Sequence, residues 1–283
     1  MTILIIGGSG FLGTELVRQA ASGGIPVAAT FATRPSDVPN VRWHALDLRD
    51  PGDIDAVMAE VEPQAIINAA SGGADWAVTA EGPIRVAMAA ARHGSRLVHV
   101  SSDAVFSGTR IHYDESSLPD PLTPYGAAKA AAETGVLLVH PGAMVARTSL
   151  IIGDRRSGHV ALVHDLAAGT RDGVLFRDDI RCPVHVTDLA DALLELAARH
   201  VAGGVHHLAG PDAVSRYELG VLIAQRDGLD AARLPTGLRA HSARPGALDV
   251  RLDSRATQER LHTRLRGACQ FLTGKVASQP ASG

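Results

Sequence analysis

Short apolar runs alternate with longer helix-like segments through the first half of the chain. The apolar runs are TILII (2–6), PVAATF (26–31), VRWHAL (41–46), AIINAA (65–70), RLVHVSS (96–102) and AMVARTSLI (143–151). Helical patterns lie between them, near residues 11–22, 51–60, 80–93 and 124–139. Strands buried on both faces are continuously apolar, and intervening helices provide the crossovers of a parallel sheet. The order therefore predicts an α/β fold with a doubly wound parallel sheet.

The second half of the chain has a looser pattern. It contains charged, glycine-rich loops (GDRRSGH and GTRDG), predicted short strands such as VLF and CPVHV, and predicted helices near residues 187–199 and 215–226. We expect residues 1–150 to form one domain and residues 151–283 to form mainly a smaller C-terminal α/β lobe, with a segment at about 180–200 returning to the first domain. The tail KVASQPASG has the composition of a frayed end.

Composition narrows the class of protein. With 283 residues and 46% hydrophobic content the chain can bury a substantial core, and its net charge of −3 comes from well-mixed acids and arginines. Such a surface offers no basic stripe, so we expect no nucleic-acid partner. The opening MTILIIGG lacks a basic segment, and no apolar run approaches about eighteen residues. We therefore expect neither a signal peptide nor a membrane partner.

The placement of cysteine and histidine bears on compartment and metal binding. Cys182 and Cys269 are too few and too far apart for a disulfide framework or a zinc site, which is typical of the cytoplasm. The thirteen histidines show no ligand-like spacing with carboxylates, and in a strand His206 and His207 would point to opposite faces. We expect a cytoplasmic protein without a metal site.

A glycine-rich segment, GGSGFLG, follows the first apolar run directly. Gly7, Gly10 and Gly13 fall three residues apart, and Gly8 in place of Gly7 gives the GxGxxG pattern. One glycine permits the tight turn, one lets the backbone approach a pyrophosphate, and the last lets helix and strand pack closely, with the phosphate at the positive end of the helix. The segment predicts a Rossmann-type dinucleotide site at Gly7, Gly10, Phe11, Leu12 and Gly13. A structural turn without a ligand is the alternative.

The residues about twenty positions further on bear on which dinucleotide is bound. An acid there would hold the ribose hydroxyls of NAD, but the chain has Thr33 and Arg34, and arginine can bind a 2′-phosphate. We expect NADPH, with NADH as the alternative cofactor and a solvated loop arginine as the alternative for Arg34. Asp47, which ends the third strand, is expected to accept from the adenine amino group or to cap the next helix. The predicted cofactor contacts at the same sheet edge also include Leu48, Ala69 and Ala70.

Two scarce residues form the candidate chemical site. The chain has two lysines against twenty-five arginines, and Lys129 stands four residues after Tyr125 in TPYGAAK, at the start of a predicted helix. This spacing puts both side chains on one face. A phenol, with a pKa of about 10, becomes a useful proton donor when a nearby cation stabilises its phenolate, and the compact lysine ammonium can do so. Ser102, at the end of the fifth strand, is expected to bind the same substrate oxygen. Ser101 faces the other way and is included among the cofactor contacts.

The order GxxGxxG, Asp47, SSDAVF and YGAAK resembles the extended short-chain dehydrogenase/reductases. SSDAVFSG with YDE, TPYGAAKAAAE, RTS and HLAG is similar to their dTDP-4-dehydrorhamnose reductase-like branch, and the similarity runs through nearly the whole chain, to RPGALDVRLDSRA and TRLRG. The resemblance implies a Ser102/Tyr125/Lys129 triad, an N-terminal NAD(P)-binding domain and a C-terminal lobe that holds a nucleotide-linked sugar. It implies a reductase of the 4-keto group of a nucleotide-activated deoxysugar, which we also expect to allow a homodimer. The expected substrate contacts are Asp103, Val105, Phe106 and Arg181.

Three positions depart from the patterns of related enzymes. Thr79 stands where this family commonly has an asparagine. Leu150 and Ile152 occur in RTSLIIG, where rhamnose-pathway reductases tend to carry RTSWVYG, and this weakens an assignment to dTDP-rhamnose synthesis. Ala104 follows Asp103, where sugar-nucleotide dehydratases place a second acid, which argues against dehydration.

The second half adds several polar candidates. Arg181, in FRDDIRCPVHVTDLA, is expected either to reach a substrate diphosphate or to form an interlobe salt bridge. The other expectations are that Asp179 accompanies Arg181, Asp188 caps a helix, Arg147 is structural, Arg244 contacts phosphate, and Tyr113 lines the site or packs behind it.

Two other functions fit parts of the same pattern. The branch also resembles the non-catalytic subunit of methionine adenosyltransferase, so an NAD(P)-binding regulatory subunit is one alternative, although an intact Ser/Tyr/Lys set argues for chemistry. An NAD-dependent sugar-nucleotide epimerase is the other. Arg34 counts against an epimerase, and so does Phe106, where epimerases usually have tyrosine.

Overall fold

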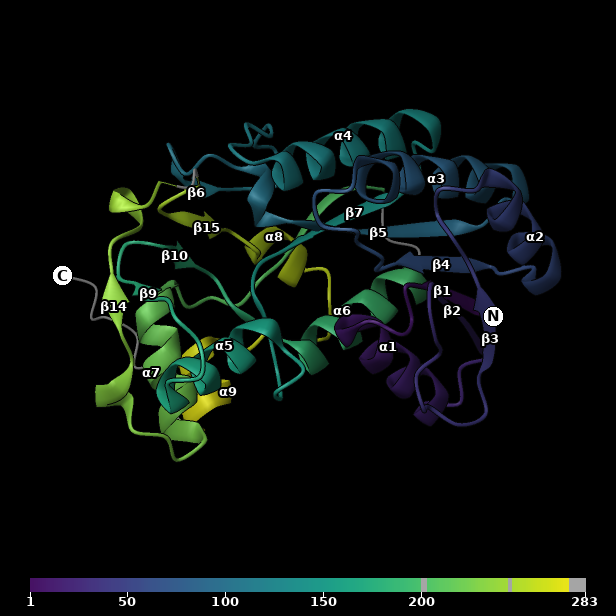
Figure 1. Ribbon diagram of the computed structural model, residues 1–283. Helices are drawn as coiled ribbons and strands as arrows, with labels where there is room; N and C mark the ends of the chain where they lie inside the picture. The colour runs from purple at the N-terminus through teal and green to yellow at the C-terminus, as the bar shows by residue number, and fades with distance from the viewer. Residues whose placement is uncertain (200–202, 244–245, 275–283) are drawn as a thin grey trace.

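A seven-stranded parallel sheet organises the molecule (Figure 1). The computed structural model describes residues 1–199, 203–243 and 246–274, so the predicted frayed tail and Arg244 lie outside the described residues. The strand order is β12-β7-β5-β4-β1-β2-β3, and every neighbouring pair is parallel. The strands are β1 (Ile3–Ile6), β2 (Val27–Phe31), β3 (Arg42–Ala45), β4 (Ala65–Asn68), β5 (Arg96–Ser102), β7 (Met144–Thr148) and β12 (Gly204–Leu208). The predicted fold class is confirmed, and the strand order reverses between β1 and β4, where open α/β sheets bind ligands.

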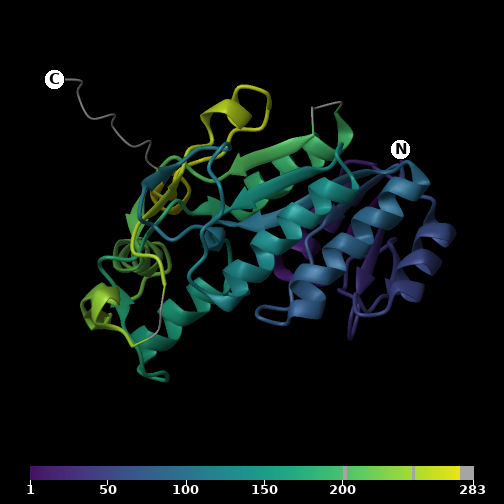
Figure 2. The same ribbon diagram turned by 90° about the horizontal axis from the view of Figure 1, so that it is seen from above.

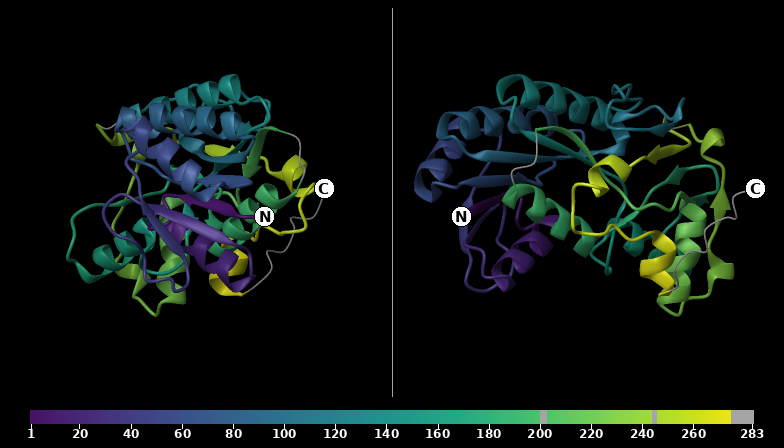
Figure 3. Two further views of the ribbon diagram at one scale, coloured as in Figure 1. Left: turned by 90° about the vertical axis from the view of Figure 1, so that its right-hand side faces the viewer. Right: turned by 180° about the vertical axis from the view of Figure 1, so that it is seen from behind.

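Helices cover both faces of this sheet (Figures 1 and 3). One face carries α1 (Phe11–Ser22) and α6 (Val186–Ala198), and the other carries α2 (Pro51–Val61), α3 (Gly82–His93) and α4 (Pro124–Val139), which lie side by side (Figure 2). The alternation of β1 explains the two layers, because Ile3 and Ile5 pack on the α1 side while Leu4 and Ile6 pack on the opposite side. A π-helical turn, Ala77–Glu81, leads into α3.

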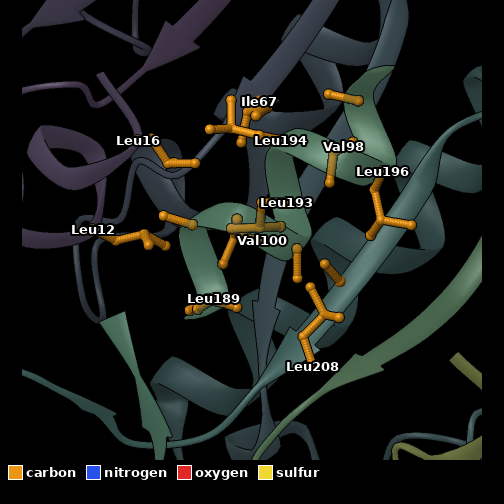
Figure 4. Close-up of a cluster of buried hydrophobic side chains, with 14 of the residues drawn as sticks. Leu12, Leu16, Ile67, Val98, Val100, Leu189, Leu193, Leu194, Leu196 and Leu208 are labelled. Carbon is orange, nitrogen blue, oxygen red and sulfur yellow. The ribbon is translucent and has the colours of Figure 1, made fainter. Parts of the chain in front are cut away.

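The apolar cluster under α1 and α6 joins the two halves of the chain (Figure 4). Leu16 of α1 and Leu193 of α6 lie there with Ile67 of β4 and Val98 of β5. The helix predicted at 187–199 is α6, and it contacts α1, β4 and β5. Residues from the second half therefore contribute both a helix and the outer strand β12 to the main sheet. The division into domains near residue 150 stays a prediction.

Most of the remaining elements gather at the end of the molecule opposite the N-terminus (Figure 3), while α8 (Arg255–Gln258) contacts β12 of the main sheet. Val160 and Val163 of α5 pack with Leu219 and Ile223 of α7 in a separate apolar cluster. The elements are α5 (Gly158–Ala168), α7 (Arg216–Arg226), α8 (Arg255–Gln258), α9 (Ala268–Thr273), and the strand pairs β8 (Ile151–Ile152) with β11 (Val184–His185), β10 (Ile180–Arg181) with β13 (Val214–Ser215), β9 (Leu175–Phe176) with β14 (Thr236–Gly237), and β6 (Ile111–Tyr113) with β15 (Val250–Leu252). The sequence predicted the charged, glycine-rich loops GDRRSGH and GTRDG on either side of α5 and no helix between them.

Capping residues set where two of these helices begin. Thr123 caps α4 by accepting from the N–H of Gly126 at 3.1 Å, with Pro124 in the first turn as expected. The expectation that Asp188 caps α6 is wrong: His185 is the cap, and Asp188 binds Arg266, with Nη2 2.7 Å from Oδ1. An acid in the first turn is still favourable there, because it faces the positive end of the helix.

The glycine-rich turn after β1 leaves no room for side chains. Gly7 has φ +77°, and a Cβ there would lie 2.8 Å from the backbone of Ala70. A Cβ on Gly13 would lie 2.0 Å from the carbonyl oxygen of Gly7. The N–H of Gly10 donates to that same oxygen at 3.0 Å, which closes the turn. Close packing of α1 on the end of β1 therefore depends on these glycines.

Replacing Gly13 with alanine is expected to lower the free energy of unfolding by about 1–3 kcal/mol, because the new methyl group must push α1 off the turn. Gly158→Ala, at the start of α5, is the matched control, since nothing lies within 4 Å of a Cβ there. We expect that variant to be neutral or more stable by up to about 1 kcal/mol. Denaturant unfolding of both variants measures this, and equal losses would contradict the packing account.

Candidate functional site

The carboxyl edge between β1 and β4 forms a cradle of small residues. Gly10 is the N-cap of α1, so the positive end of this helix faces the edge. Ala69 and Ala70 follow β4 there, and the Ala69 N–H donates to the carbonyl of Ile6 at 3.0 Å. Of the two bulky residues predicted beside these, Phe11 is half-buried and Leu12 is buried in the core. The side chain of Leu12 thus serves packing, which leaves only its backbone for a cofactor.

The predicted selectivity residues follow β2. Thr33 and Arg34 are both exposed, and within the described part of the chain Arg34 makes no hydrogen bond or ion pair. Its guanidinium is therefore available for a 2′-phosphate, which its planar donors suit. The site predicted to bind the cofactor thus has a cation at the position expected for NADP(H).

Asp47 and Leu48 follow β3 at the same edge. The Asp47 carboxylate accepts from the backbone N–H of Arg49 at 3.0 Å and from its Nη1 at 3.2 Å. The alternative that Asp47 caps α2 is wrong, because Asp50 does so by accepting from the N–H of Gly52 at 2.7 Å. Leu48 is buried against α3. Asp47 is thus exposed beside the cradle, where a contact with adenine stays a prediction.

The three residues of the predicted triad come together at the end of β5. Ser102 is the last residue of β5, and Tyr125 and Lys129 occupy successive turns of α4. The hydroxyls of Ser102 and, unexpectedly, of Ser71 lie near enough to the phenol of Tyr125 to lower its pKa. Lys129 is buried, and its Nζ donates to the carbonyl of Val100 at 2.9 Å. Their catalytic role stays a prediction.

Burial controls the protonation of this site. It raises the pKa of Tyr125, as the charge of Asp103 also does, while the Ser102 and Ser71 hydroxyls lower it. The expected lowering of this pKa by Lys129 is not what the structure shows, since the net shift is upward and the lysine ammonium is directed at Val100. The phenol therefore stays protonated at neutral pH, as a proton donor must.

The ammonium group of Lys129 loses its proton more readily than that of an exposed lysine. Burial lowers its pKa to about 8, and the nearby charge of Glu133 raises it in part. The same ammonium, added to burial, lowers the pKa of His99 on β5 well below its ordinary value. At neutral pH the site therefore holds a cationic lysine next to a neutral histidine.

A buried ion pair fixes α4 against the sheet. Glu133, one turn after Lys129, accepts from Arg147 of β7, with Oε2 2.8 Å from Nη2 and Oε1 3.0 Å from Nε. The Ser101 hydroxyl donates to Glu133 Oε1 at 2.5 Å, so this side chain points to α4 and only its backbone remains for the predicted cofactor contact. Arg147 also lies over the ring of Phe106, 4.9 Å from its centroid. Arg147 is thus structural, as expected.

Asp103 links the triad to the second half of the chain. Its Oδ1 accepts from the Ser102 hydroxyl at 3.2 Å, and its Oδ2 accepts from the Ser149 hydroxyl at 2.6 Å. Nε of Arg181 lies 3.7 Å from the same Oδ2, and Nη1 lies 3.0 Å from Asp179. Asp103, Ser149, Asp179 and Arg181 are buried, and Ser102 is half-buried. Hydrogen bonds and ion pairs therefore connect Ser102, through Asp103, to Arg181 of β10.

Arg181 was expected to contact the substrate, but in this network its guanidinium is bound by other groups of the protein. Its Nη1 donates to the carbonyl of Ile180 at 2.7 Å and its Nη2 donates to that of Ala247 at 2.9 Å. These bonds use the donors that a diphosphate would need, so the geometry favours the salt-bridge alternative that the sequence left open.

Two further predicted contacts, Val105 and Phe106, are fully buried. The Phe106 ring stacks on Tyr113 with centroids 4.1 Å apart, inside an apolar cluster. Packing behind the site thus accounts for Tyr113, and the same holds for both predicted side chains. Any direct contact of Val105 or Phe106 with substrate is left to backbone atoms.

Sequence reasoning missed Ser71 and left the role of Thr79 in question. Thr79 is buried, and its hydroxyl donates to the carbonyl of Gly73 at 2.9 Å and accepts from the N–H of Gly72 at 3.1 Å. It therefore supplies polar support to the loop that carries Ser71. The signal for Ser71 is its place shortly after β4, because the paired parallel strands β4 and β5 end at the same edge of the sheet.

Two absences concern only the described residues. Within residues 1–199, 203–243 and 246–274, no three His, Cys, Asp or Glu side chains are grouped so as to hold a metal ion. Over the same part of the chain, none of the helices combines the length and apolarity needed to cross a bilayer.

Comparison with known proteins agrees with this geometry. The family model described as the RmlD substrate binding domain matches residues 1–266. The dTDP-4-dehydrorhamnose reductase of Mycobacterium tuberculosis (strain ATCC 25618 / H37Rv) is 32% identical over 259 residues, 86% of this chain and 81% of that protein. Methionine adenosyltransferase 2 subunit beta of Xenopus laevis is 28% identical over 82% of this chain and 73% of that protein. The crystal structure of the Bacillus anthracis dTDP-4-dehydrorhamnose reductase in complex with NADP superposes with a TM-score of 0.80 at 22% identity, over 96% of each chain.

Replacing Glu133 with glutamine is expected to lower the free energy of unfolding by about 3–5 kcal/mol, because it leaves Arg147 charged and buried without its partner. Glu81→Gln is the matched control. It breaks the partly exposed i,i+4 pair of Glu81 with Arg85 on the protein surface and should cost less than about 1 kcal/mol. Chemical denaturation compares them, and a Glu133→Gln variant as stable as the control would refute the structural role of the pair.

Proposed function

The chain belongs to the RmlD substrate binding domain family, and on that premise we propose that it is an NADPH-dependent reductase of a nucleotide-activated 4-keto-6-deoxy sugar. The observation that carries the proposal is the convergence of Ser102, Tyr125 and Lys129 at the end of β5. The curated relatives that are dTDP-4-dehydrorhamnose reductases, at up to 32% identity, support it. The small residues at the carboxyl edge between β1 and β4 fit the cofactor.

The cradle fits a dinucleotide on two structural grounds. A Cβ at Gly7 or Gly13 would fill the space in which the turn packs. Glycine at these positions therefore leaves the backbone accessible to a pyrophosphate at this edge. Arg34 is exposed and uncommitted among the described residues, so it can meet a 2′-phosphate. When bound, NADPH supplies the hydride.

The chain's own residues handle the proton and the substrate oxygen. Tyr125, protonated at neutral pH, donates its phenol proton to the carbonyl oxygen as charge develops there. Ser102 donates to Asp103 at 3.2 Å in the structure, and rotation of its hydroxyl redirects that bond to the substrate oxygen. Lys129 keeps a positive charge near the phenolate that remains and holds the cofactor ribose. Asp103, fixed by Ser149, presents its carboxylate beside the sugar.

The proposal also covers the setting of the reaction. It takes a water-soluble nucleotide sugar as substrate, in the cytoplasm, with neither nucleic acid nor membrane as partner, and with a homodimer as the assembly. Sedimentation equilibrium of the purified protein determines the assembly.

A non-catalytic regulatory role is the second candidate, because one relative is a subunit of methionine adenosyltransferase. Such a protein would bind the dinucleotide without turnover. The buried Lys129 and the interactions of Tyr125 with Ser102 favour chemistry. Keeping a cation buried costs stability, which binding alone does not require.

We expect Tyr125→Phe to lower kcat for NADPH oxidation by about 10²–10⁴-fold on the best of a panel of dTDP-, UDP- and GDP-4-keto sugars, with dinucleotide affinity retained. Tyr113→Phe is the matched control, since it changes a tyrosine that packs behind the site. Stopped-flow absorbance at the nicotinamide band measures turnover. Near-normal turnover by Tyr125→Phe would refute the mechanism, and no oxidation with any sugar by the native chain would favour the regulatory role.

Arg34→Ala is expected to weaken NADPH binding by at least about tenfold, the loss of one charge-assisted contact, and to leave NADH binding unchanged. Arg42→Ala, on the neighbouring strand β3, controls for general loss of positive charge. Isothermal titration calorimetry with both dinucleotides gives the two constants. An equal loss for NADPH and NADH would show that Arg34 does not read the 2′-phosphate.

A further inference from the structure

Arg216 lies at the far end of the charged network that begins at Asp103. Its Nε is 3.3 Å from Oδ1 of Asp179, and the same oxygen lies 3.0 Å from Nη1 of Arg181. Nε of Arg181 is 3.7 Å from Asp103, whose carboxylate accepts from the hydroxyl of Ser102 at 3.2 Å. A continuous series of contacts therefore leads from the serine of the triad to the guanidinium of Arg216.

The backbone fixes the position from which this side chain extends. Strands β10 and β13 pair antiparallel, with Ile180 opposite Ser215. Ser215 caps α7 in a capping box, since its hydroxyl accepts from the N–H of Glu218 at 3.1 Å and its own N–H donates to the Glu218 carboxylate at 2.8 Å. Arg216 follows as the first residue of α7, and its N–H donates to the carbonyl of Asp179 at 3.0 Å. A strand pair and a helix cap thus hold the start of the side chain.

Solvent reaches Arg216 more readily than the other charged groups of the network. Its side chain is 24% exposed, against 10% for Arg181, 9% for Asp103 and 7% for Asp179. Burial among protein atoms nonetheless lowers the pKa of this guanidinium, although the charge of Asp179 opposes that shift. The group therefore lies in a recess and not on an open surface. Charges attract one another more strongly there than in bulk water, so the recess favours an anion that enters it.

The two Nη groups of Arg216 are uncommitted. Neither donates a hydrogen bond to another of the described residues, and Asp179 lies nearest to Nε. Arg181, in contrast, gives its Nη groups to the carbonyls of Ile180 and Ala247. A guanidinium with free Nη groups presents planar donors that match the oxygens of a phosphate. Of the two arginines in the network, Arg216 is therefore the one equipped to bind an anion.

We propose that Arg216 is a substrate-binding residue that holds the diphosphate of the nucleotide sugar. This assignment rests on the proposed function, in which the 4-keto group lies at Ser102 and Tyr125. The diphosphate of such a substrate is attached to C1 of the same sugar ring, so it lies a short distance from the triad. Arg216 supplies a cation with free donors on the side of the site where the contacts from Ser102 lead.

Binding of this kind acts on the substrate and the transition state alike, because the diphosphate does not change while the carbonyl is reduced. Loss of Arg216 should therefore raise KM and leave kcat nearly unchanged. Loss of Tyr125, which acts on the reacting oxygen, is expected to lower kcat. The two residues thus have different kinetic signatures.

Three variants test the assignment. Arg216→Ala removes the guanidinium while Asp179 keeps Arg181 as its partner, so we expect the variant to fold and to keep the native melting temperature. Arg216→Lys retains the charge without the planar donors. Arg233→Ala is the matched control, because this exposed arginine also belongs to the second half of the chain and its side chain makes no hydrogen bond or ion pair with the described residues.

Isothermal titration calorimetry measures the contact without turnover. Each protein is titrated with dTDP, UDP and GDP and with their nucleosides, in excess NADP⁺ so that the cofactor cradle is occupied. The native chain should bind at least one diphosphate about tenfold or more tightly than its nucleoside, and Arg216→Ala should lose about tenfold or more of that affinity, the effect of charge-assisted hydrogen bonds. Arg216→Lys should fall between the two, and Arg233→Ala should match the native chain. NADPH affinity should be the same in all four proteins.

The outcomes separate this assignment from the proposed function. Equal diphosphate affinity in Arg216→Ala and the native chain overturns the assignment and leaves the function intact, and so does a loss of kcat without a change in KM. If the native chain reduces no 4-keto sugar but Arg216→Ala still loses diphosphate affinity, the function fails and the diphosphate site stands. If the native chain binds no diphosphate better than its nucleoside, the assignment is wrong.

Discussion

A fully buried ion pair, Glu133 of α4 with Arg147 of β7, is the interaction on which the site depends. It is supported by Ser101 of β5, so one carboxylate ties a helix to two strands. Glu133 lies one helical turn after Lys129, and any rotation of α4 would break this bidentate contact before it moved Tyr125 away from Ser102. Because an unpaired buried charge is costly, the helix has one favourable setting, and this setting places the phenol at the end of β5.

The Glu133 carboxylate of this pair also offsets part of the cost of burying Lys129. Burial lowers the lysine pKa from 10.5 to about 8, so the unfolded chain binds more protons than the folded chain between these values. Stability from this group therefore rises with pH across that interval, and below about pH 8 the charged lysine destabilises the fold. The contact with Val100 and the charge of Glu133 limit this penalty. The fold thus keeps a cation on the same helix as the proposed proton donor, and neighbouring groups limit the loss of stability that its burial causes.

The sequence predicted the sheet, its helices and the spacing of Tyr125 and Lys129, because these follow from local periodicity and motif order. It also predicted short strands at VLF and CPVHV, where β9 and β11 lie, but it predicted neither α5 nor the partners of these strands, because two-residue runs carry almost no periodic signal. The engagement of Arg181 with backbone carbonyls was equally hidden, since it depends on where Ala247 comes to lie. The approach of Ser71 to Tyr125 required the pairing of β4 with β5, and the direction of the Lys129 ammonium required the depth of its burial.

The most direct measurement of the central claim follows the hydride itself. NADPH carrying deuterium on the transferred position of C4 is incubated with the native chain and a dTDP-4-keto-6-deoxy sugar, and the products are analysed by mass spectrometry and NMR. The account predicts one deuterium at C4 of the product sugar, with one NADP⁺ released for each sugar reduced. Unlabelled sugar with the dinucleotide unchanged, or an epimerised sugar with the dinucleotide still bound, would contradict it.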